Sequence, residues 1–538
     1  MSVTRQGYGQ LIHEDGRVSV DGVSTLADST LANRDLDPVP IEKRTWGTYN
    51  FTALWVGMAH NIPSWTLASG LVAIGMDWKQ SVLTIVVANI IVLIPILLNG
   101  HAGTKYGIPF PVFVRSSFGV RGANLPAILR ALVACAWFGI NTWIGGSGIY
   151  LLAGKLIGNW WVNAAAVGGH PWTMWFSFAV FLALEVFIIL HGMEAVRRFE
   201  NWAAPVVIAA ALALLIWITV KAGGFGSILS EPGTLHGAAF WKVFFPSLMG
   251  MIGFWATLSL NISDFTRFGG SQKAQIKGQA LGLPTTMTLF ALLSVLVTAA
   301  GERIWGTAIW DPIELTAKIE NPIGILVALF TVLVASLSVN IAANLVSPAY
   351  DFANALPKYI TFKRGAIVAI IIGVLIQPWR LIANPDMYIF TWLGFYGGIL
   401  GPIAGILIGD YWIVRQKFLV VPDLYSSRKD GAYWFKGGWN WRGVVTLVVS
   451  ALLAIGGSYS GVDAKGVKSG PFPVDGLIPF LKPLADFGWL IGIIAAIALQ
   501  VALNKIFPPA HLKDSLLDES KLTVPEPVGP RNVPDTVA

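Results

Sequence analysis

Indole and carboxamide side chains recur within apolar segments of this chain, at spacings that place them on one helix face. Trp137 and Asn141 are four residues apart, as are Asn340 and Asn344. Trp255 supplies a second indole. Two aromatic faces can hold a flat ring between them, and amides can read its edge because a carboxamide both donates and accepts hydrogen bonds. These residue types favour a site for a planar heterocycle.

The same residues also have a structural interpretation. Tryptophans anchor helices at membrane interfaces, and asparagines join neighbouring helices by hydrogen bonds. Taken singly, each residue fits either role. Taken together at one depth of the membrane, they favour binding.

Oxygen ligands for a weakly held monovalent cation are suggested by the small and hydroxylated residues Ala335, Ser336 and Ser338. They could place a carbonyl and a hydroxyl opposite residues 57–60. Close packing between helices explains these small residues equally well.

Two ionisable residues fall inside apolar segments, where such groups are functional candidates. His60 titrates near neutral pH and could carry a coupling proton, although a neutral histidine that satisfies free carbonyls is the simpler interpretation. Glu185 is interpreted as a neutral or paired carboxylic acid of the scaffold, ahead of a proton relay. Asp264 and Arg267 could latch an inner gate or form a solvated pair.

Two apolar segments contain helix-breaking residues in their middles, at 55–63 and 250–257. In a bilayer, irregular backbone survives only where protein or a water-filled cavity satisfies it. Trp55 recurs as Trp255 and Asn61 as Asn261, at the same offset of 200 residues. Five spans lie from the start of span one to the start of span six, an odd number, so the two copies enter the membrane in opposite directions. This predicts a five-plus-five inverted repeat with helices 1 and 6 broken around a site at the bilayer midplane.

The composition predicts an all-α integral membrane protein. Of 538 residues, 54% are hydrophobic and only 12% are charged, about half the charged fraction of a soluble domain. The apolar stretches are near or above the ~20 residues that a spanning helix needs, and are too long for barrel strands. About twelve spans are predicted, at 47–75, 80–99, 125–154, 172–192, 200–221, 243–263, 279–300, 323–345, 365–382, 388–414, 443–461 and 484–506.

The loops that follow even-numbered spans are basic, which places them and both termini in the cytoplasm and explains the net charge of +7 without nucleic acid. The predicted organisation is a disordered N-terminus at 1–45, repeats at 46–222 and 223–416, two added spans at 417–506 and a disordered tail at 507–538. Cys135 is the only cysteine, so the chain has no internal disulfide.

Five motifs, at residues 99–112, 137–143, 254–268, 340–351 and 410–411, resemble the nucleobase:cation symporter-1 family. The resemblance runs from about Glu42 to the end of span twelve, and looks closest to bacterial allantoin permeases and plant-type nucleobase carriers. It implies a LeuT-like fold of a five-plus-five inverted repeat with two extra helices.

The resemblance also implies the residues of a ligand site. The family's stacking tryptophans fall on Trp137 and Trp255, and its ligand-reading amides on Asn141 and Asn344. Asn141 is a Gln in hydantoin carriers. A shorter amide leaves room for a bulkier ligand or reaches it through water.

Two further departures from the family pattern reshape the implied pocket. Asn61 takes the place of a Gln near the ligand, and Phe254 replaces a Gly. Both changes bear on which ring the pocket accepts.

The family's sodium site maps onto the carbonyls of Gly57, His60 and Ala335 and the side chains of Ser338 and Val339. Position 339 is a hydroxyl residue in sodium-coupled members, so the valine removes one ligand. Water could complete the remaining four, or the driving ion could be a proton carried by His60.

The sequence therefore predicts a secondary active importer of a nucleobase-like ring, such as allantoin, uracil, another purine or pyrimidine base, or a hydantoin. Na⁺ or H⁺ would drive it through alternating access. We expect a monomeric multi-pass protein of the plasma membrane, whose partners are the heterocycle and the bilayer and which uses no cofactor beyond the coupling cation.

Two other classes fit less well. A membrane-embedded hydrolase of the same rings needs clustered metal ligands, whereas the seven histidines are scattered mostly in loops. A facilitative channel needs a continuous polar pore, whereas the few polar residues of the apolar segments lie at one depth of the membrane. ATP drive is not supported, because the sequence lacks a Walker A signature.

Overall fold

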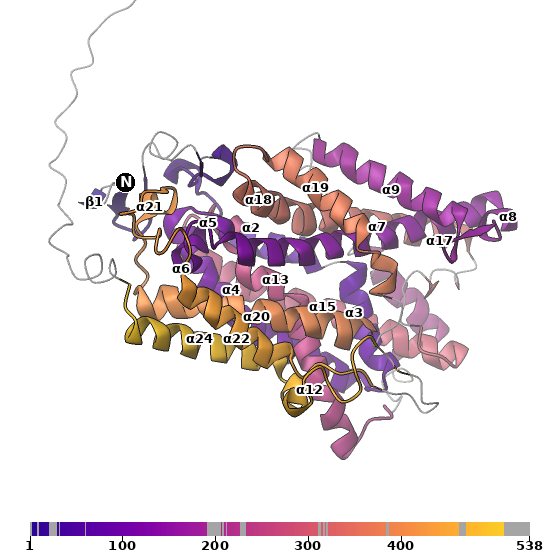
Figure 1. Ribbon diagram of the computed structural model, residues 1–538. Coiled ribbons are helices and arrows are strands. Elements are labelled where there is room, and N and C mark those ends of the chain that lie inside the picture. The colour runs from indigo at the N-terminus through magenta and orange to yellow at the C-terminus, as the bar shows by residue number, and fades with distance from the viewer. Residues whose placement is uncertain are drawn as a thin grey trace, which may run out of the picture.

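The computed structural model is a bundle of long helices that run alongside one another (Figure 1). It describes residues 3–7, 10–20, 30–31, 33–59, 61–190, 206, 209–210, 212–225, 233–309, 314–315, 318, 321–382, 387–461, 468 and 470–509.

The first half of the described chain is dominated by three long helices: α4 (Trp78–Tyr106), α7 (Asn124–Ile157) and α9 (Trp172–Leu190). Shorter elements accompany them: α2 (Thr48–Ala59), α3 (Ile62–Ala73), α5 (Phe110–Phe113), α6 (Arg115–Phe118), α8 (Asn159–Val162) and the antiparallel strands β4 (Ala166–Val167) and β5 (His170–Pro171).

The second half contains α12 (Gly237–Phe254), α13 (Ala256–Asn261), α14 (Ser263–Thr266), α15 (Gln272–Trp305), α17 (Pro322–Val339), α18 (Val346–Ala355), α19 (Phe362–Leu375) and α20 (Gly394–Ile408). Three π-helical segments adjoin them: η3 (Asn340–Leu345), η5 (Met387–Leu393) and η6 (Gly409–Val414). The last elements are α21 (Val421–Leu424), α22 (Trp441–Ile455), α23 (Lys482–Ala485) and α24 (Gly488–Ile506), with single 3₁₀ turns at η4 (Pro378–Arg380) and η7 (Pro479–Leu481).

Local sequence signals explain where α4 begins and ends. Asp77 and Gln80 form a reciprocal capping box at its start, and Gly107 follows its last turn with φ 71°, a left-handed conformation that glycine adopts without strain. α4 therefore extends past the predicted span at 80–99 and ends at Tyr106, so it carries the first part of the motif that begins at Asn99.

Six of the described helices are long and apolar enough to cross a membrane, and further apolar helices of 10–17 residues accompany them. The fold is therefore that of a helical membrane protein. The count of twelve spans stays a prediction, since much of the predicted span at 200–221 lies outside the described residues.

The helical path is interrupted at the two places where the sequence contains helix-breaking residues. α2 ends at Ala59 and α3 begins at Ile62, with Asn61 extended between them at φ −141° and ψ 163°. α12 ends at Phe254 and α13 begins at Ala256, with Trp255 at φ −99° and ψ 8°.

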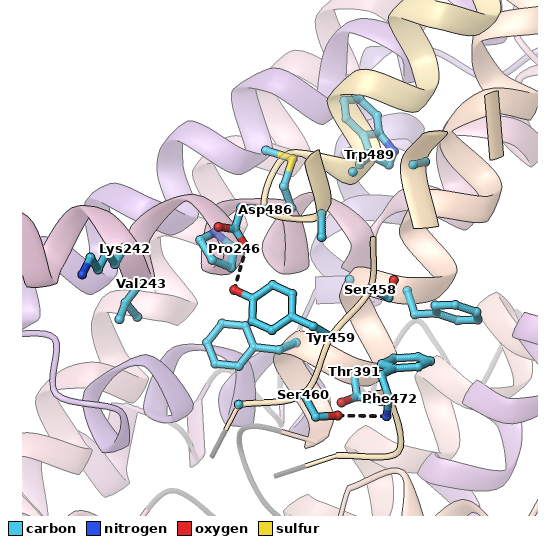
Figure 2. Close-up of a pocket in the computed structure, with 18 residues that line it drawn as sticks. Lys242, Val243, Pro246, Thr391, Ser458, Tyr459, Ser460, Phe472, Asp486 and Trp489 are labelled. Atoms are coloured by element: carbon cyan, nitrogen blue, oxygen red, sulfur yellow. Dashed lines mark hydrogen bonds between the residues drawn. The ribbon is translucent and has the colours of Figure 1, made fainter. Parts of the chain in front are cut away.

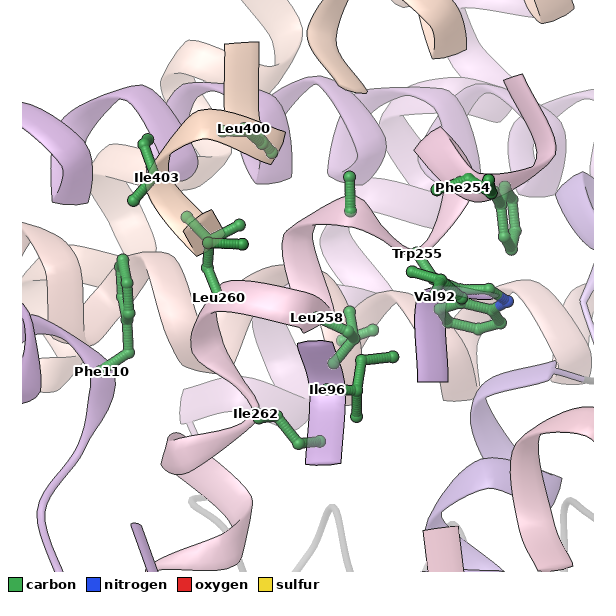
Figure 3. Packing of buried hydrophobic residues seen from close by; sticks show 14 of the residues in the cluster. Val92, Ile96, Phe110, Phe254, Trp255, Leu258, Leu260, Ile262, Leu400 and Ile403 are labelled. Atoms are coloured by element: carbon green, nitrogen blue, oxygen red, sulfur yellow. The ribbon is translucent and has the colours of Figure 1, made fainter. Parts of the chain in front are cut away.

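Two groups of helices form the interior. α15 packs against α2, α3 and α4, whereas α7 packs against α9, α17, α18 and α19. Side chains of α4, such as Val92 and Ile96, lie beside Trp255 and Leu258 of the interrupted segment (Figure 3). The interruption is therefore embedded in the core.

The N-terminal segment, for which composition predicts disorder, contains ordered elements among its described residues. They are β1 (Val3–Gly7), β2 (Gln10–His13), β3 (Val18–Ser19), η1 (Arg34–Leu36) and η2 (Ile41–Lys43). Gln10 of β2 donates to the carbonyl of Leu419 and accepts from the amide of Val421, the first residue of α21. Polar composition did not reveal this order because the stabilising partners lie about 400 residues away along the chain. In the predicted tail at 507–538, residues 510–538 lie outside the described chain.

Candidate functional site

Trp137 of α7 lies in a cluster of aromatic rings from three segments. Its indole Nε1 donates to the hydroxyl of Tyr396 at 3.1 Å. Its ring centroid lies 5.2 Å from that of Phe254 and 6.1 Å from those of Tyr388 and Trp392. The indole is 5% exposed, so it is a core residue at helix mid-length and no interfacial anchor.

Trp255 occupies the interruption between α12 and α13. Its ring makes edge contacts with Phe254, at 4.8 Å between centroids, and with Trp55 of α2, at 5.1 Å. Phe254 thus contacts both predicted stacking indoles, Trp137 and Trp255, and all three rings are buried. Trp55 and Trp255, which recur at an offset of 200 residues in the sequence, meet each other edge to face.

Sequence reasoning missed the contribution of span ten to this cluster. Tyr388, Trp392 and Tyr396 recur at every fourth position of η5 and α20, and all three contact Trp137. That spacing was the available signal, because residues four apart share a helix face.

Asn141 and Asn344 each present a carbonyl oxygen. Asn141 Nδ2 donates to the backbone carbonyl of Trp137 at 3.1 Å, and its buried Oδ1 has no hydrogen-bond partner within the described chain. Asn344 Nδ2 donates to Asn340 Oδ1 at 2.9 Å. The Asn344 amide is thereby oriented with its oxygen directed away from Asn340.

Asn340 is held by the scaffold. Its Nδ2 lies 2.9 Å from the Phe138 carbonyl, 3.1 Å from Thr142 Oγ1 and 2.6 Å from Glu185 Oε1. These contacts join η3 to α7 and α9. Its side chain is fully buried, and its role as a direct ligand contact stays a prediction.

Asn61 caps α3. Its Oδ1 accepts from the backbone N–H of Ser64 at 2.7 Å, and its Nδ2 donates to the Met58 carbonyl at 2.5 Å. Both groups of the amide therefore stabilise the interruption after α2. Contact between Asn61 and a ligand remains a prediction.

The residues mapped to a cation site lie on α2 and α17, two helices that pack against each other. Gly57 is half-buried, whereas Ala335 and Val339 are buried. His60 and the side chain of Ser338 lie outside the described residues. The hydrocarbon side chain of Val339 cannot replace a hydroxyl ligand.

Asp264 and Arg267 are buried and make separate contacts. Asp264 Oδ1 accepts from the Phe110 amide at 2.8 Å, and Arg267 Nη2 donates to the Tyr350 hydroxyl at 3.0 Å. Arg267 Nη1 also reaches the Asp35 carbonyl at 3.4 Å. They are therefore not a solvated surface pair.

A cavity of about 360 Å³ lies between the middle of α12, η5 and the start of α20, the end of α22, the start of α24 and the segments between these last two helices (Figure 2). The Tyr459 hydroxyl donates to Asp486 Oδ1 at 2.9 Å on its wall. Burial raises the pKa of Asp486 above its ordinary value and that of Tyr459 to about 12. None of the residues predicted to bind substrate or cation lines this cavity.

Comparison with known proteins gives consistent matches over most of the chain. Residues 38–492 match the family model described as permease for cytosine/purines, uracil, thiamine and allantoin. The allantoin permease of Bacillus subtilis is 40% identical over 508 residues, which cover 93% of this chain and 98% of that protein. The purine-uracil permease of Arabidopsis thaliana is 42% identical over 472 residues, covering 86% and 78%.

The fold also matches solved transporters. The structure of Mhp1, a nucleobase-cation-symport-1 family transporter with bromovinylhydantoin bound, superimposes with a TM-score of 0.71 and 26% identity, and the match covers 91% of this chain and 98% of Mhp1. A crystal structure of MhsT with L-phenylalanine matches with a TM-score of 0.52 and 15% identity, a likeness of fold alone.

Proposed function

Because this chain belongs to the family of permeases for cytosine and purines, uracil, thiamine and allantoin, and is thus a transport protein with no enzymatic role, we propose that it imports a cyclic ureide or nucleobase. Allantoin and uracil are the leading substrates, and a Na⁺ or H⁺ gradient drives the uptake. The relatives named for allantoin and for purines and uracil support this range.

The observation that carries the proposal is a set of polar groups that lack partners within the described chain. Asn141 Oδ1 and the indole N–H groups of Trp55 and Trp255 are all buried without a hydrogen bond. A buried polar group left unsatisfied costs about 1–3 kcal/mol, so a ligand or water that pairs with it is favoured.

These groups match the edge of a ureide ring. Asn141 and Asn344 offer carbonyl oxygens that accept from ring N–H groups, and the Trp55 indole, which has no stacking role here, offers an N–H donor to a ring carbonyl. Uracil, allantoin and hydantoins alternate N–H and C=O along their edges. An aromatic ring that moves aside, Phe254 being the candidate between Trp137 and Trp255, would open the space for stacking.

The same arrangement supports alternating access as the mechanism. The interruptions at Asn61 and Trp255 divide two helices into halves, and rocking of the helices around them would expose the ring to each side in turn. The five-plus-five repeat at 46–222 and 223–416, a plasma-membrane location and cytoplasmic termini are parts of this proposal.

Thermal stabilisation of the purified protein tests the function. Purines, pyrimidines, hydantoins and allantoin are each added with and without Na⁺. A ring at about 100 times its Kd should stabilise the folded state by about 2.7 kcal/mol. The proposal fails if no ring at millimolar concentration shifts the melting temperature and none is taken up by proteoliposomes.

A further inference from the structure

A carboxyl group to which the proposed function assigns no role is buried where three helical segments meet. Glu185 of α9 is 0% exposed. Its Oε1 lies 2.6 Å from Asn340 Nδ2, and its Oε2 lies 2.8 Å from Thr142 Oγ1. Glu185 therefore connects α9 to α7 and to η3.

No cationic side chain in the described part of the chain forms an ion pair with Glu185. Among the described residues, the titratable groups on the elements packed against α9 are Arg130, Cys135, Tyr150 and Lys155 on α7, His170 on β5, and Lys363 and Arg364 on α19. On α7, the basic residue nearest to Thr142 in sequence is Arg130, twelve residues or about 18 Å along the helix, and it pairs with Asp351. An isolated carboxylate in such surroundings is strongly disfavoured.

The groups around Glu185 can form hydrogen bonds with either the charged or the protonated carboxyl group, and only hydrogen atoms need to move between the two arrangements. With the carboxylate charged, Asn340 donates to Oε1 and to the Phe138 carbonyl, and the single hydroxyl hydrogen of Thr142 goes to Oε2. With Oε2 protonated, Glu185 donates to Thr142 Oγ1, and the Thr142 hydroxyl turns to the Phe138 carbonyl, 2.8 Å away. A purely structural carboxylic acid needs only one of these arrangements.

The same cluster reaches the proposed ligand site through one side chain. Asn340 Oδ1 accepts from Asn344 Nδ2 at 2.9 Å, so the Asn344 oxygen, the proposed acceptor for a ring N–H, points away from Asn340. The charge on Glu185 sets how strongly Asn340 is polarised, and Asn340 in turn orients Asn344.

We infer that Glu185 is a proton-binding site whose loading is coupled to substrate binding, which makes this permease a proton symporter. Loading forms one O–H bond at Oε2, neutralises the carboxylate and rotates the Thr142 hydroxyl, and release to the other side of the membrane reverses these changes. The inference rests on the proposed function and names its driving ion.

Purified full-length protein in proteoliposomes tests this inference, with radiolabelled allantoin as the first probe and uracil as the second. An inside-alkaline gradient of about one pH unit, without Na⁺, can support about tenfold accumulation in a one-proton symport, since one pH unit is worth 1.36 kcal/mol. The wild type should accumulate the probe. Glu185→Gln should lose this accumulation, and the exchange that remains should no longer vary with pH. Glu302→Gln, which removes an exposed acid at the end of α15, should behave as wild type.

Uptake and thermal stabilisation, measured together, distinguish a failure of the proton site from a failure of the proposed function. pH-driven accumulation by Glu185→Gln at the wild-type level overturns the proton site, as does wild-type uptake that needs a Na⁺ gradient and ignores pH. Thermal stabilisation by a ring would still support the permease function in both cases.

If Glu185→Gln does not fold, Thr142→Val should shift the pH midpoint of uptake upward, because the carboxylate loses a donor, and Thr142→Ser should restore it. An unchanged midpoint in Thr142→Val contradicts the inference.

Discussion

Two buried polar clusters join α7 to the continuous helical path of α17, η3 and α18, and they are built differently. In one, Arg130 Nη1 lies 3.2 Å from Asp351 Oδ2, and both side chains are fully buried. In the other, the hydrogen-bond partners of Glu185 within the described chain are the neutral groups of Asn340 and Thr142. A cationic partner favours the charged form of a buried carboxylate, whereas a carboxyl group among neutral dipoles has no opposite charge to stabilise its ionised form. The first cluster is suited to hold the helices together and the second to respond to a proton.

The largest effect that would sharpen this contrast is on stability. Arg130→Met leaves the Asp351 carboxylate buried without its partner and should lower the free energy of unfolding by about 3–5 kcal/mol. Thermal unfolding in detergent measures the change, and Arg130→Met combined with Asp351→Leu should recover most of it. Glu185→Gln should cost much less, because its hydrogen bonds can be kept. Equal losses in the two clusters would remove the distinction between them.

Ligand affinity should depend on the aromatic cluster around Trp137, which lies one helical turn from Asn141 on α7. Trp137→Ala and Trp255→Ala should each weaken ring binding by about 1–3 kcal/mol if the indoles stack on the ring. Trp143→Ala is the matched control, because this buried indole of α7 packs against Trp175 and Trp379 in a separate cluster. Calorimetric titration of the three variants should separate them, and wild-type affinity in Trp137→Ala or Trp255→Ala would remove that residue from the site.

Asn344 provides a smaller and more specific test of whether the Glu185 cluster communicates with the ligand. Asn344→Leu should weaken binding by about 1 kcal/mol, the net worth of one hydrogen bond. An N-methylated form of the same ring, which lacks the N–H, should bind the variant and the wild type alike. A similar loss for both rings would indicate a packing role.

The smallest expected effect concerns the cation. Val339→Thr restores a hydroxyl at the mapped sodium position. Because this adds one neutral oxygen ligand, it should strengthen Na⁺ binding by a few tenths to about 1 kcal/mol and so make uptake respond more strongly to Na⁺. Uptake at a series of Na⁺ concentrations measures it, with Val334→Thr on the same helix as the control. An unchanged response would count against a cation site at this position.

The helical membrane fold and the transporter family could be predicted from the sequence, since long apolar segments and ordered motifs are properties of the local chain. The i, i+4 spacing of Asn340 and Asn344 also predicted their proximity, and their amides are hydrogen-bonded. What the sequence did not reveal depends on tertiary contacts. The aromatic rings of Tyr388 and Trp392 gain meaning only when α7 packs beside them.

Asn61 illustrates a different difficulty. The run Asn-Ile-Pro at 61–63 combines an N-cap residue with a proline near the start of a helix, a pattern typical of a helix beginning. The same asparagine also matches a ligand position by family resemblance. We predicted only the ligand position from the sequence, whereas the hydrogen bonds to Ser64 and Met58 display the capping role.

The hydrogen bonds of Gln10 have a consequence for how the protein is made. Its partners, Leu419 and Val421, are synthesised some four hundred residues after it. Gln10 must therefore wait until residues 419–421 have left the ribosome before it can dock. Because contacts of such long sequence separation form late, this joint should be one of the final events of biogenesis.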